Sequence, residues 1–342
     1  NMLRDADINS PDSYIVENMG LDVFNQETIE GYKNLFIANK GEEHVFSKEP
    51  LEKFLFHIGA INYDENNVPH PTKAGLLMFG YDYHIVRVYP NYFLDYQDHR
   101  HKIGDMRWSN RICSSVGDWS GNLLDFYWRI ANKLVEDLPI PFKLEGFFRV
   151  DNTPMHDAMR EALCNTLCNA DFNNSRGLVV KQYEDNIYFT NPGALAMPLN
   201  KALKGGTSDA RNKTILAMFN NIKIGERGGT GIPKIWTATK DAEYPTPILI
   251  DSFNPDITEL TVFIKKDKTN TITSTKSVDL NLTEQEQIIV DYIKQYGFIR
   301  RSTVEDILGI KQRRANTIIN DLISKNIIIR NGINKNMKYH LK

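Results

Sequence analysis

Apolar and polar residues recur at helical spacing between Thr153 and Asp171, and this pattern predicts one amphipathic helix. Thr153 suits the N-cap of that helix, and Pro154 suits its first position. The apolar side of the predicted helix consists of Ala158, Met159, Ala162, Leu163, Thr166 and Leu167. The polar side consists of Asp157, Glu161, Asn165 and Asn169. This polar side is either a solvated surface or part of a functional site.

Upstream of this helix, the same periodicity predicts several further elements. The predicted helices are residues 25–38, 47–58, 72–80 and 122–138, and residues 85–96 have the composition of a strand. Ser47 suits the N-cap of the second of these helices. Residues 98–102, Asp-His-Arg-His-Lys, are interpreted as a charged loop at an exposed strand end. We prefer this interpretation to a metal site because no second group of ligands follows nearby.

Downstream of Asp171, period-two alternation predicts a sheet. The predicted strands are residues 178–183, 186–190, 247–253 and 259–265. The first two form a hairpin that turns at Glu184 and Asp185. Residues 194–225 contain Gly205 and Gly206, and glycine pairs allow the hinge motion of a lid, although an ordinary loop has the same composition.

Two features of this region favour a magnesium–phosphate site. Glu161 and Asn165 lie one helical turn apart, where a carboxylate can activate water and a neutral amide oxygen can ligate a hard cation. The run Gly228, Gly229, Thr230 and Gly231 precedes a predicted helix that ends near Asp241. Glycines at a helix start let backbone N–H groups approach a phosphate closely. A solvated helix face and an ordinary turn are the alternatives.

The C-terminal part predicts a winged helix-turn-helix. Its helices are residues 283–296, 302–308 and 311–325, and the two strands of the wing are 327–330 and 337–341. The net charge of the chain is −2, but residues 297–342 contain ten Lys/Arg and three Asp/Glu, so this segment carries +7 and the remainder −9. This asymmetry favours a DNA-binding surface over protein contacts, which are the alternative. The candidate DNA-binding residues are Arg300, Arg301, Lys311, Arg313, Arg314, Asn316, Thr317, Lys335 and Lys338.

Composition gives no sign of a membrane protein or a disulfide-rich protein. The 342 residues suffice for two or three domains, and no apolar run approaches the ~20 residues of a membrane helix. The three cysteines, Cys113, Cys164 and Cys168, do not suggest a disulfide framework, and we expect buried thiols. These features predict a cytoplasmic protein with no membrane partner.

Four motifs in order resemble the GHKL ATPase superfamily, which includes gyrase B, histidine kinases and MutL. They are the run Arg160-Glu161-Ala162-Leu163-Cys164-Asn165-Thr166-Leu167-Cys168-Asn169-Ala170-Asp171-Phe172, then Asn191-Pro192-Gly193, Arg211-Asn212 and Gly229-Thr230-Gly231-Ile232. The pattern is most similar to bacterial predicted transcriptional regulators that join such an ATPase to a C-terminal helix-turn-helix. Relatives are often labelled as RecG-related DNA helicases, and they carry a Schlafen/Alba-like domain upstream. We therefore expect this sequence to lack that upstream domain.

The resemblance implies an α+β chain with a GHKL (Bergerat-type) α/β sandwich, preceded by a small α/β region and followed by the winged helix. The expected segments are residues 1–41 (helical), 42–150 (small α/β domain), 151–266 (ATP-binding domain), 267–280 (linker) and 281–342 (winged helix). ATP and Mg²⁺ are the implied cofactors, and duplex DNA is the implied partner; a homodimer is left open.

By the same resemblance, Glu161 is the general base and Asn165 the magnesium ligand. The implied nucleotide-binding residues are Asn165, Asn169, Asn191, Gly193, Arg211, Asn212, Gly228, Gly229, Thr230 and Gly231. Among them, Asn191 contacts the adenine, although the wider superfamily has an aspartate there and an amide accepts without charge. The subgroup has His-Arg where this chain has Asn169 and Ala170.

We therefore expect weak or absent ATPase activity in a DNA-binding regulator. The alternative is a degenerate scaffold that binds no nucleotide and presents its winged helix to DNA or protein. A helicase motor is rejected because the chain has no G-x-x-x-x-G-K-[ST] loop. A histidine kinase is rejected because no histidine-bearing dimerisation helix precedes the nucleotide region.

Overall fold

The computed structural model of the chain describes residues 10–140, 144–145, 148–149, 152–206, 209–225, 231–252, 255–266, 283–325, 327–331 and 337–341. The chain divides into two compact units. The first consists of Asn1–Tyr244 and Ile250–Lys265, and the second of Pro245–Leu249 and Lys266–Lys342.

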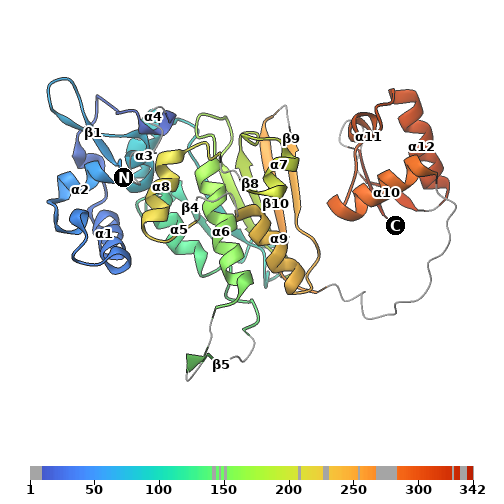
Figure 1. Cartoon of the computed structure of the whole chain (residues 1–342), viewed down its shortest axis with the longest axis horizontal. Helices are drawn as coiled ribbons and strands as arrows, with labels where there is room; N and C mark the ends of the chain where they lie inside the picture. The colour runs from blue at the N-terminus through green and yellow to red at the C-terminus, as the bar shows by residue number, and fades with distance from the viewer. Residues whose placement is uncertain are drawn as a thin grey trace. The chain divides into compact units, whose positions relative to one another are not determined.

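A mixed six-stranded sheet is the framework of the first unit, with the strand order β4-β3-β7-β8-β10-β9 (Figure 1). Its strands are β3 (Leu94–Asp98), β4 (Asn110–Cys113), β7 (Leu178–Gln182), β8 (Asn186–Pro192), β9 (Ile248–Ser252) and β10 (Ile257–Phe263). Strand β3 pairs with β7 in parallel, whereas β3–β4, β7–β8 and β8–β10 are antiparallel pairs. The domain boundary expected at residue 150 therefore lies between strands of one sheet. The expected segments 42–150 and 151–266 both contribute strands to this sheet.

Helix α6 (Pro154–Asn169) confirms the amphipathic helix that the sequence predicts. It contacts α5 (Leu123–Ala131), α8 (Lys213–Asn221), α9 (Gly231–Asp241) and strand β8. Figure 1 shows α6 and α9 side by side in front of the strands. The apolar side of α6 is fully buried, which explains why this helix packs at the centre of the layer. Thr153 occupies the N-cap, but its hydroxyl pairs with Nδ1 of His156 (2.7 Å) and makes no capping bond to the backbone.

The N-terminal part of this unit is mostly helical. Its helices are α1 (Gln26–Lys40), α2 (Leu51–His57), α3 (Lys73–Phe79) and α4 (Asp82–Val88), and β1 (Ile61–Tyr63) pairs with β2 (Pro69–Pro71). Short 3-10 helices are η1 (Pro11–Ser13), η2 (Leu21–Val23), η3 (Val45–Lys48) and η4 (Ser114–Val116). The remaining elements are β5 (Leu144–Glu145), β6 (Phe148–Arg149) and α7 (Leu199–Lys204).

The strand predicted over residues 85–96 is wrong in its first half. Helix α4 occupies residues 82–88, and strand β3 begins only at Leu94. The β-branched residues of α4 favour a strand, but Ile85 is fully buried while Arg87 is exposed on the same helix. Tertiary packing thus outweighs a weak local preference.

Two predicted helices are shorter than expected. Residues 47–58 form α2 only from Leu51, because Pro50 keeps Glu49 extended (φ −73°, ψ 148°) and η3 precedes it. Of residues 122–138, only 123–131 are helical. Just after the helix, the backbone carbonyl of Lys133 accepts a hydrogen bond from Nε2 of Gln182 on β7 (3.1 Å). Turns then complete the segment.

The charged run 98–102 is less exposed than the sequence predicts. The Arg100 side chain is buried, and its guanidinium bonds to Asp98 (2.9 and 2.6 Å), Glu136 (2.5 Å) and Asp137 (2.6 Å). Burial by itself raises the pKa of the Asp98 carboxyl, but the hydrogen bonds from Arg100 outweigh it and hold that pKa below its usual value. An ion-pair network therefore lies at this end of the sheet, with Arg100 and Asp98 buried and Glu136 and Asp137 partly exposed.

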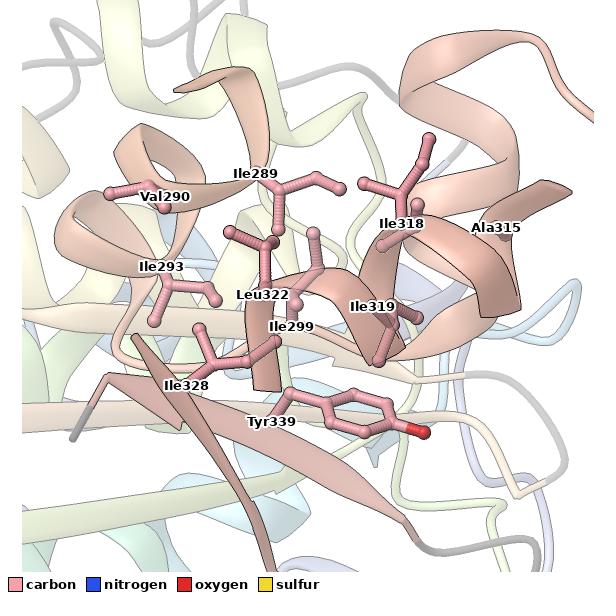
Figure 2. Packing of buried hydrophobic residues seen from close by; sticks show 11 residues of the cluster. Ile289, Val290, Ile293, Ile299, Ala315, Ile318, Ile319, Leu322, Ile328 and Tyr339 are labelled. Carbon is pink, nitrogen blue, oxygen red and sulfur yellow. The ribbon is translucent and has the colours of Figure 1, made fainter. Parts of the chain in front are cut away.

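The described residues from 283 onward in the second unit form three helices and a two-stranded sheet. These are α10 (Glu284–Tyr296), α11 (Arg301–Leu308), α12 (Gln312–Ser324), β11 (Ile328–Asn331) and β12 (Lys338–Leu341). Figure 2 shows how aliphatic side chains from these elements, such as Ile289, Ile319 and Ile328, meet in one core that Tyr339 flanks. Lys325, at the end of α12, bonds to the buried carboxylate of Glu286 on α10 (2.7 Å) and fastens the two helices together.

Candidate nucleotide and DNA sites

The polar side of α6 lies against the start of α9. Glu161 is only 5% exposed, so this face is not a solvated surface at that position. The amide nitrogen of Asn165 donates to Oε1 of Glu161 (3.1 Å). This bond directs the amide oxygen of Asn165 away from the carboxylate, and that oxygen is the atom suited to ligate a cation.

Gly231 allows α9 to begin directly on these two side chains. A Cβ atom at this position would lie 2.3 Å from Oε1 of Glu161 and 2.6 Å from Nδ2 of Asn165, which is far inside van der Waals contact. A residue with a Cβ fits here only if the ends of both side chains shift. The first N–H groups of a helix have no partner inside it and attract anions. Gly228, Gly229 and Thr230 lie outside the described residues.

Asn191 is the third candidate side chain, and it lies near the end of β8. It is 7% exposed, and its Oδ1 atom is buried without a hydrogen-bond partner. An unpaired buried oxygen is costly, so a donor supplied by a ligand would satisfy it. The residues present therefore fit a nucleotide whose base offers an N–H group at Asn191 and whose phosphates approach Gly231.

Two polar residues near this strand end, Thr258 beside Asn191 and Asp251 beside Thr258, were not predicted from the sequence. Thr258 on β10 lies directly opposite Asn191 in the strand register, and its hydroxyl donates to the carbonyl of Gly193 (2.9 Å). Asp251 on β9 accepts from the backbone N–H of Leu195 (3.1 Å), and burial raises the pKa of its carboxyl. The strand register identifies Thr258, and side-chain contacts identify Asp251.

The other candidate nucleotide residues surround the C-terminal end of α6. Asn169 donates to the carbonyl of Asn165 (2.8 Å) and accepts from the backbone N–H of Arg211 (3.3 Å). Gly193 has a φ of +99°, which favours glycine. Arg211 and Asn212 bond chiefly to backbone carbonyls of this region.

The candidate DNA-binding residues belong to the second unit. Lys311, Arg313 and Arg314 are exposed at the start of α12, and Thr317 is exposed one turn later. Asn316 is half-buried on the same helix.

Arg300 and Arg301 lie at the start of α11, where Arg301 pairs with Glu305 (3.0 Å). The Lys338 ammonium lies 4.1 Å from the ring centroid of Phe298. Lys335 lies outside the described residues. A pair that the sequence analysis missed joins β11 to α12, because Nη2 of Arg330 donates to Oδ1 of Asn320 (2.6 Å).

Within the described ranges, no group of three or more His, Cys, Asp or Glu residues is arranged to hold a metal ion. Over the same ranges, none of the helices combines the length and the apolar character that crossing a membrane requires.

Two family models match parts of the chain. Residues 1–95 match a model described as "Domain of unknown function (DUF8451)". Residues 176–262 match a model described as "Putative ATP-dependent DNA helicase recG C-terminal", which is ATPase-like. The second match includes Asn191, Gly193 and Gly231, whereas Glu161 and Asn165 precede it.

No curated protein matches the chain. Among solved structures, the chain is similar to the crystal structure of the DIP2311 protein from Corynebacterium diphtheriae, with a TM-score of 0.55 and 16% sequence identity. The similarity covers 97% of this chain and 64% of that one, so the chain spans less than two thirds of its length. At this identity, the likeness concerns the fold alone.

Proposed function

We propose that residues 151–266 bind ATP with Mg²⁺ and that the C-terminal unit binds duplex DNA, so that the chain acts as a nucleotide-responsive regulator. One observation carries the nucleotide part of this proposal. Gly231 brings the N-terminus of α9 onto Glu161 and Asn165, so close that a Cβ atom would overlap the ends of both side chains. The ATPase-like match over residues 176–262 supports the same conclusion.

Each side chain has a distinct role in this proposal. The oxygen of Asn165 holds Mg²⁺, and the N–H groups at the start of α9 face the phosphates. Asn191 accepts a hydrogen bond from the adenine amino group, and Thr258 lies beside it. Bound Mg²⁺ supplies neutralisation of phosphate charge. Glu161 acts as a general base that holds a water molecule and accepts its proton.

The magnesium role of Asn165 predicts a loss of affinity in Asn165→Ala. This change removes the cation ligand and also one hydrogen-bond donor to Glu161, so the affinity for ATP–Mg²⁺ should fall by about 1–3 kcal/mol. The affinity for ATP in the presence of EDTA should change much less. Isothermal titration calorimetry of both proteins, with and without Mg²⁺, measures the difference. Equal losses in the two conditions would remove Asn165 from the cation site.

The role of Glu161 as a base predicts that Glu161→Gln retains nucleotide binding and loses turnover. The amide preserves the shape of the side chain but cannot accept a proton. Because we expect turnover to be weak or absent in the wild-type chain, release of phosphate should be followed over hours at high protein concentration. A measurable rate that is equal in the two proteins would exclude Glu161 as the base.

The DNA part of the proposal rests on the second unit. Its three helices and two-stranded sheet support a winged helix-turn-helix, in which α12 is the recognition helix and β11–β12 is the wing. Exposed cations cluster at the start of α12, and the Arg330–Asn320 pair fixes one wing arginine beside that helix. Backbone phosphates are the natural partners of such a surface.

This proposal predicts that two basic side chains, Arg313 and Lys338, contribute to DNA affinity in different ways. Arg313→Ala removes an exposed group from the recognition helix and should cost roughly 1–3 kcal/mol on a preferred sequence, if it contacts a base edge. Lys338→Ala should weaken binding to all DNA sequences alike. It should also lower the slope of log affinity against log salt concentration by about one. Fluorescence anisotropy with random and genomic duplexes at several salt concentrations tests both. No binding even at low salt would make this unit a protein-contact module.

A nucleotide-free scaffold is the second candidate, and one contact favours it. Both polar atoms of the Asn169 amide bond to the protein itself, so this residue has a structural role in the conformation described. A direct titration with ATP separates the two candidates, because the scaffold would show no binding.

A further inference from the structure

Arg211 and Asn212 close the C-terminal end of α6. The backbone N–H and the Nδ2 of Asn212 both donate to the carbonyl of Cys168 (3.0 and 3.1 Å), and Nδ2 also donates to Ala170 (2.8 Å). Nε of Arg211 donates to the carbonyl of Asn169 (3.3 Å). The last carbonyls of a helix lack partners within it, so these two residues supply what the end of α6 needs.

The guanidinium of Arg211 also reaches the segment that follows β8. Its Nη2 atom donates to the carbonyl of Ala194 (2.8 Å), and a Cβ on Gly193 would lie 3.1 Å from the same atom. Gly193 is only two residues beyond Asn191. One side chain therefore ties the end of α6 to the exit of the strand that carries Asn191.

Asp12, near the N-terminus, holds the helix that directly follows Arg211 and Asn212. Helix α8 begins at Lys213, and the buried carboxylate of Asp12 accepts from the backbone N–H groups of Thr214 and Ile215 (3.0 Å each). A carboxylate at a helix N-terminus is a strong cap. Because α8 starts directly after Asn212, this cap restricts where Arg211 can move.

We propose that Arg211 is a positioning residue for the base end of the nucleotide site and that it does not bind phosphate. This inference rests on the nucleotide binding proposed above. The nitrogen atoms Nε and Nη2 are committed to backbone carbonyls at the end of α6 and after β8. The phosphate end of the site, at Glu161 and Gly231, lies about two helical turns earlier along α6.

The geometry gives Arg211 a signature that a phosphate ligand would not have. Loss of the guanidinium should loosen Asn191 and so reduce the affinity for adenosine and for ATP–Mg²⁺ by the same factor, about tenfold, equivalent to 1.4 kcal/mol. Lysine should not restore the affinity, because a single ammonium cannot reproduce the planar fork that joins two carbonyls. If Arg211 bound phosphate, its loss would instead reduce the affinity for ATP far more than the affinity for adenosine. Lysine at this position would then restore much of the lost affinity.

The experiment titrates adenosine and ATP–Mg²⁺ into the wild-type chain, Arg211→Ala and Arg211→Lys by calorimetry, with thermal unfolding recorded for each protein. Gly193→Ala is a second variant that disturbs the same contact from the opposite side, and it decides the question if the Arg211 variants are unfolded. Arg87→Ala, which removes an exposed arginine from α4, is the control and should bind both ligands as the wild type does.

Equal losses for adenosine and ATP in the Arg211 variants and in Gly193→Ala support the proposal. A loss confined to ATP, a rescue by lysine, or unchanged affinities would overturn it while nucleotide binding itself stands. Failure of the wild-type chain to bind either ligand would overturn the proposed function, and this inference with it.

Discussion

Gly231→Ala is expected to abolish nucleotide binding while the chain remains folded. The added Cβ would lie 2.3 Å from Oε1 of Glu161 and 2.6 Å from Nδ2 of Asn165, so α9 must move away from α6 or the ends of both side chains must shift. The first response withdraws the backbone N–H groups of α9 from the phosphates, and the second displaces the proposed cation ligand and base. We expect the affinity for ATP–Mg²⁺ to fall by roughly 100-fold or more, about 2.7 kcal/mol.

A second glycine provides the matched control for this experiment. Unlike Gly231, Gly117 has a left-handed φ of +79°, and a Cβ there would meet no atom within 4 Å. Gly117→Ala should therefore cost about 1 kcal/mol of stability through backbone strain and leave nucleotide affinity unchanged. Wild-type affinity in Gly231→Ala would show that the close approach of α9 to α6 has no part in binding.

Arg100→Leu is expected to cause the largest loss of stability. The substitution leaves Asp98, which is 7% exposed, without the two guanidinium bonds that hold its carboxylate. Breaking a buried ion pair by removing one partner costs about 3–5 kcal/mol. Urea unfolding monitored by circular dichroism measures this change in the free energy of unfolding.

The double variant Asp98→Leu/Arg100→Leu tests the cause of that loss. Removing both charges eliminates the uncompensated carboxylate, so the double variant should be more stable than Arg100→Leu alone. Arg87→Ala, on the exposed side of α4, should change the free energy of unfolding by no more than about 0.5 kcal/mol. A loss below about 1 kcal/mol in Arg100→Leu would contradict a stabilising role for this network.

Local periodicity predicted much of the fold because several elements carry a strong pattern. Helix α6, the β7–β8 hairpin and the elements of the second unit all begin and end within a few residues of the expected positions. The parallel pairing of β3 with β7 could not be predicted, because about 80 residues separate the two strands and no local signal specifies the partner. The same limit explains why the sheet crosses the expected domain boundary.

In the candidate site too, local spacing predicts some contacts, and others depend on tertiary packing. Glu161 and Asn165 share one face of one helix, so their spacing alone places them together. The approach of Gly231 to both side chains, and the position of Thr258 opposite Asn191, depend on tertiary packing and strand register. The contacts of Arg211 with two carbonyls have no sequence signal, since any exposed loop arginine would look the same.

The most direct test of nucleotide binding is a calorimetric titration of the wild-type chain with ATP, with and without Mg²⁺, paired with thermal unfolding under the same conditions. We expect saturable binding of one ATP per site, tighter with Mg²⁺ than without it, and a rise in the unfolding temperature that grows with ligand concentration. No heat and no shift of the unfolding temperature at millimolar ATP–Mg²⁺ would contradict it.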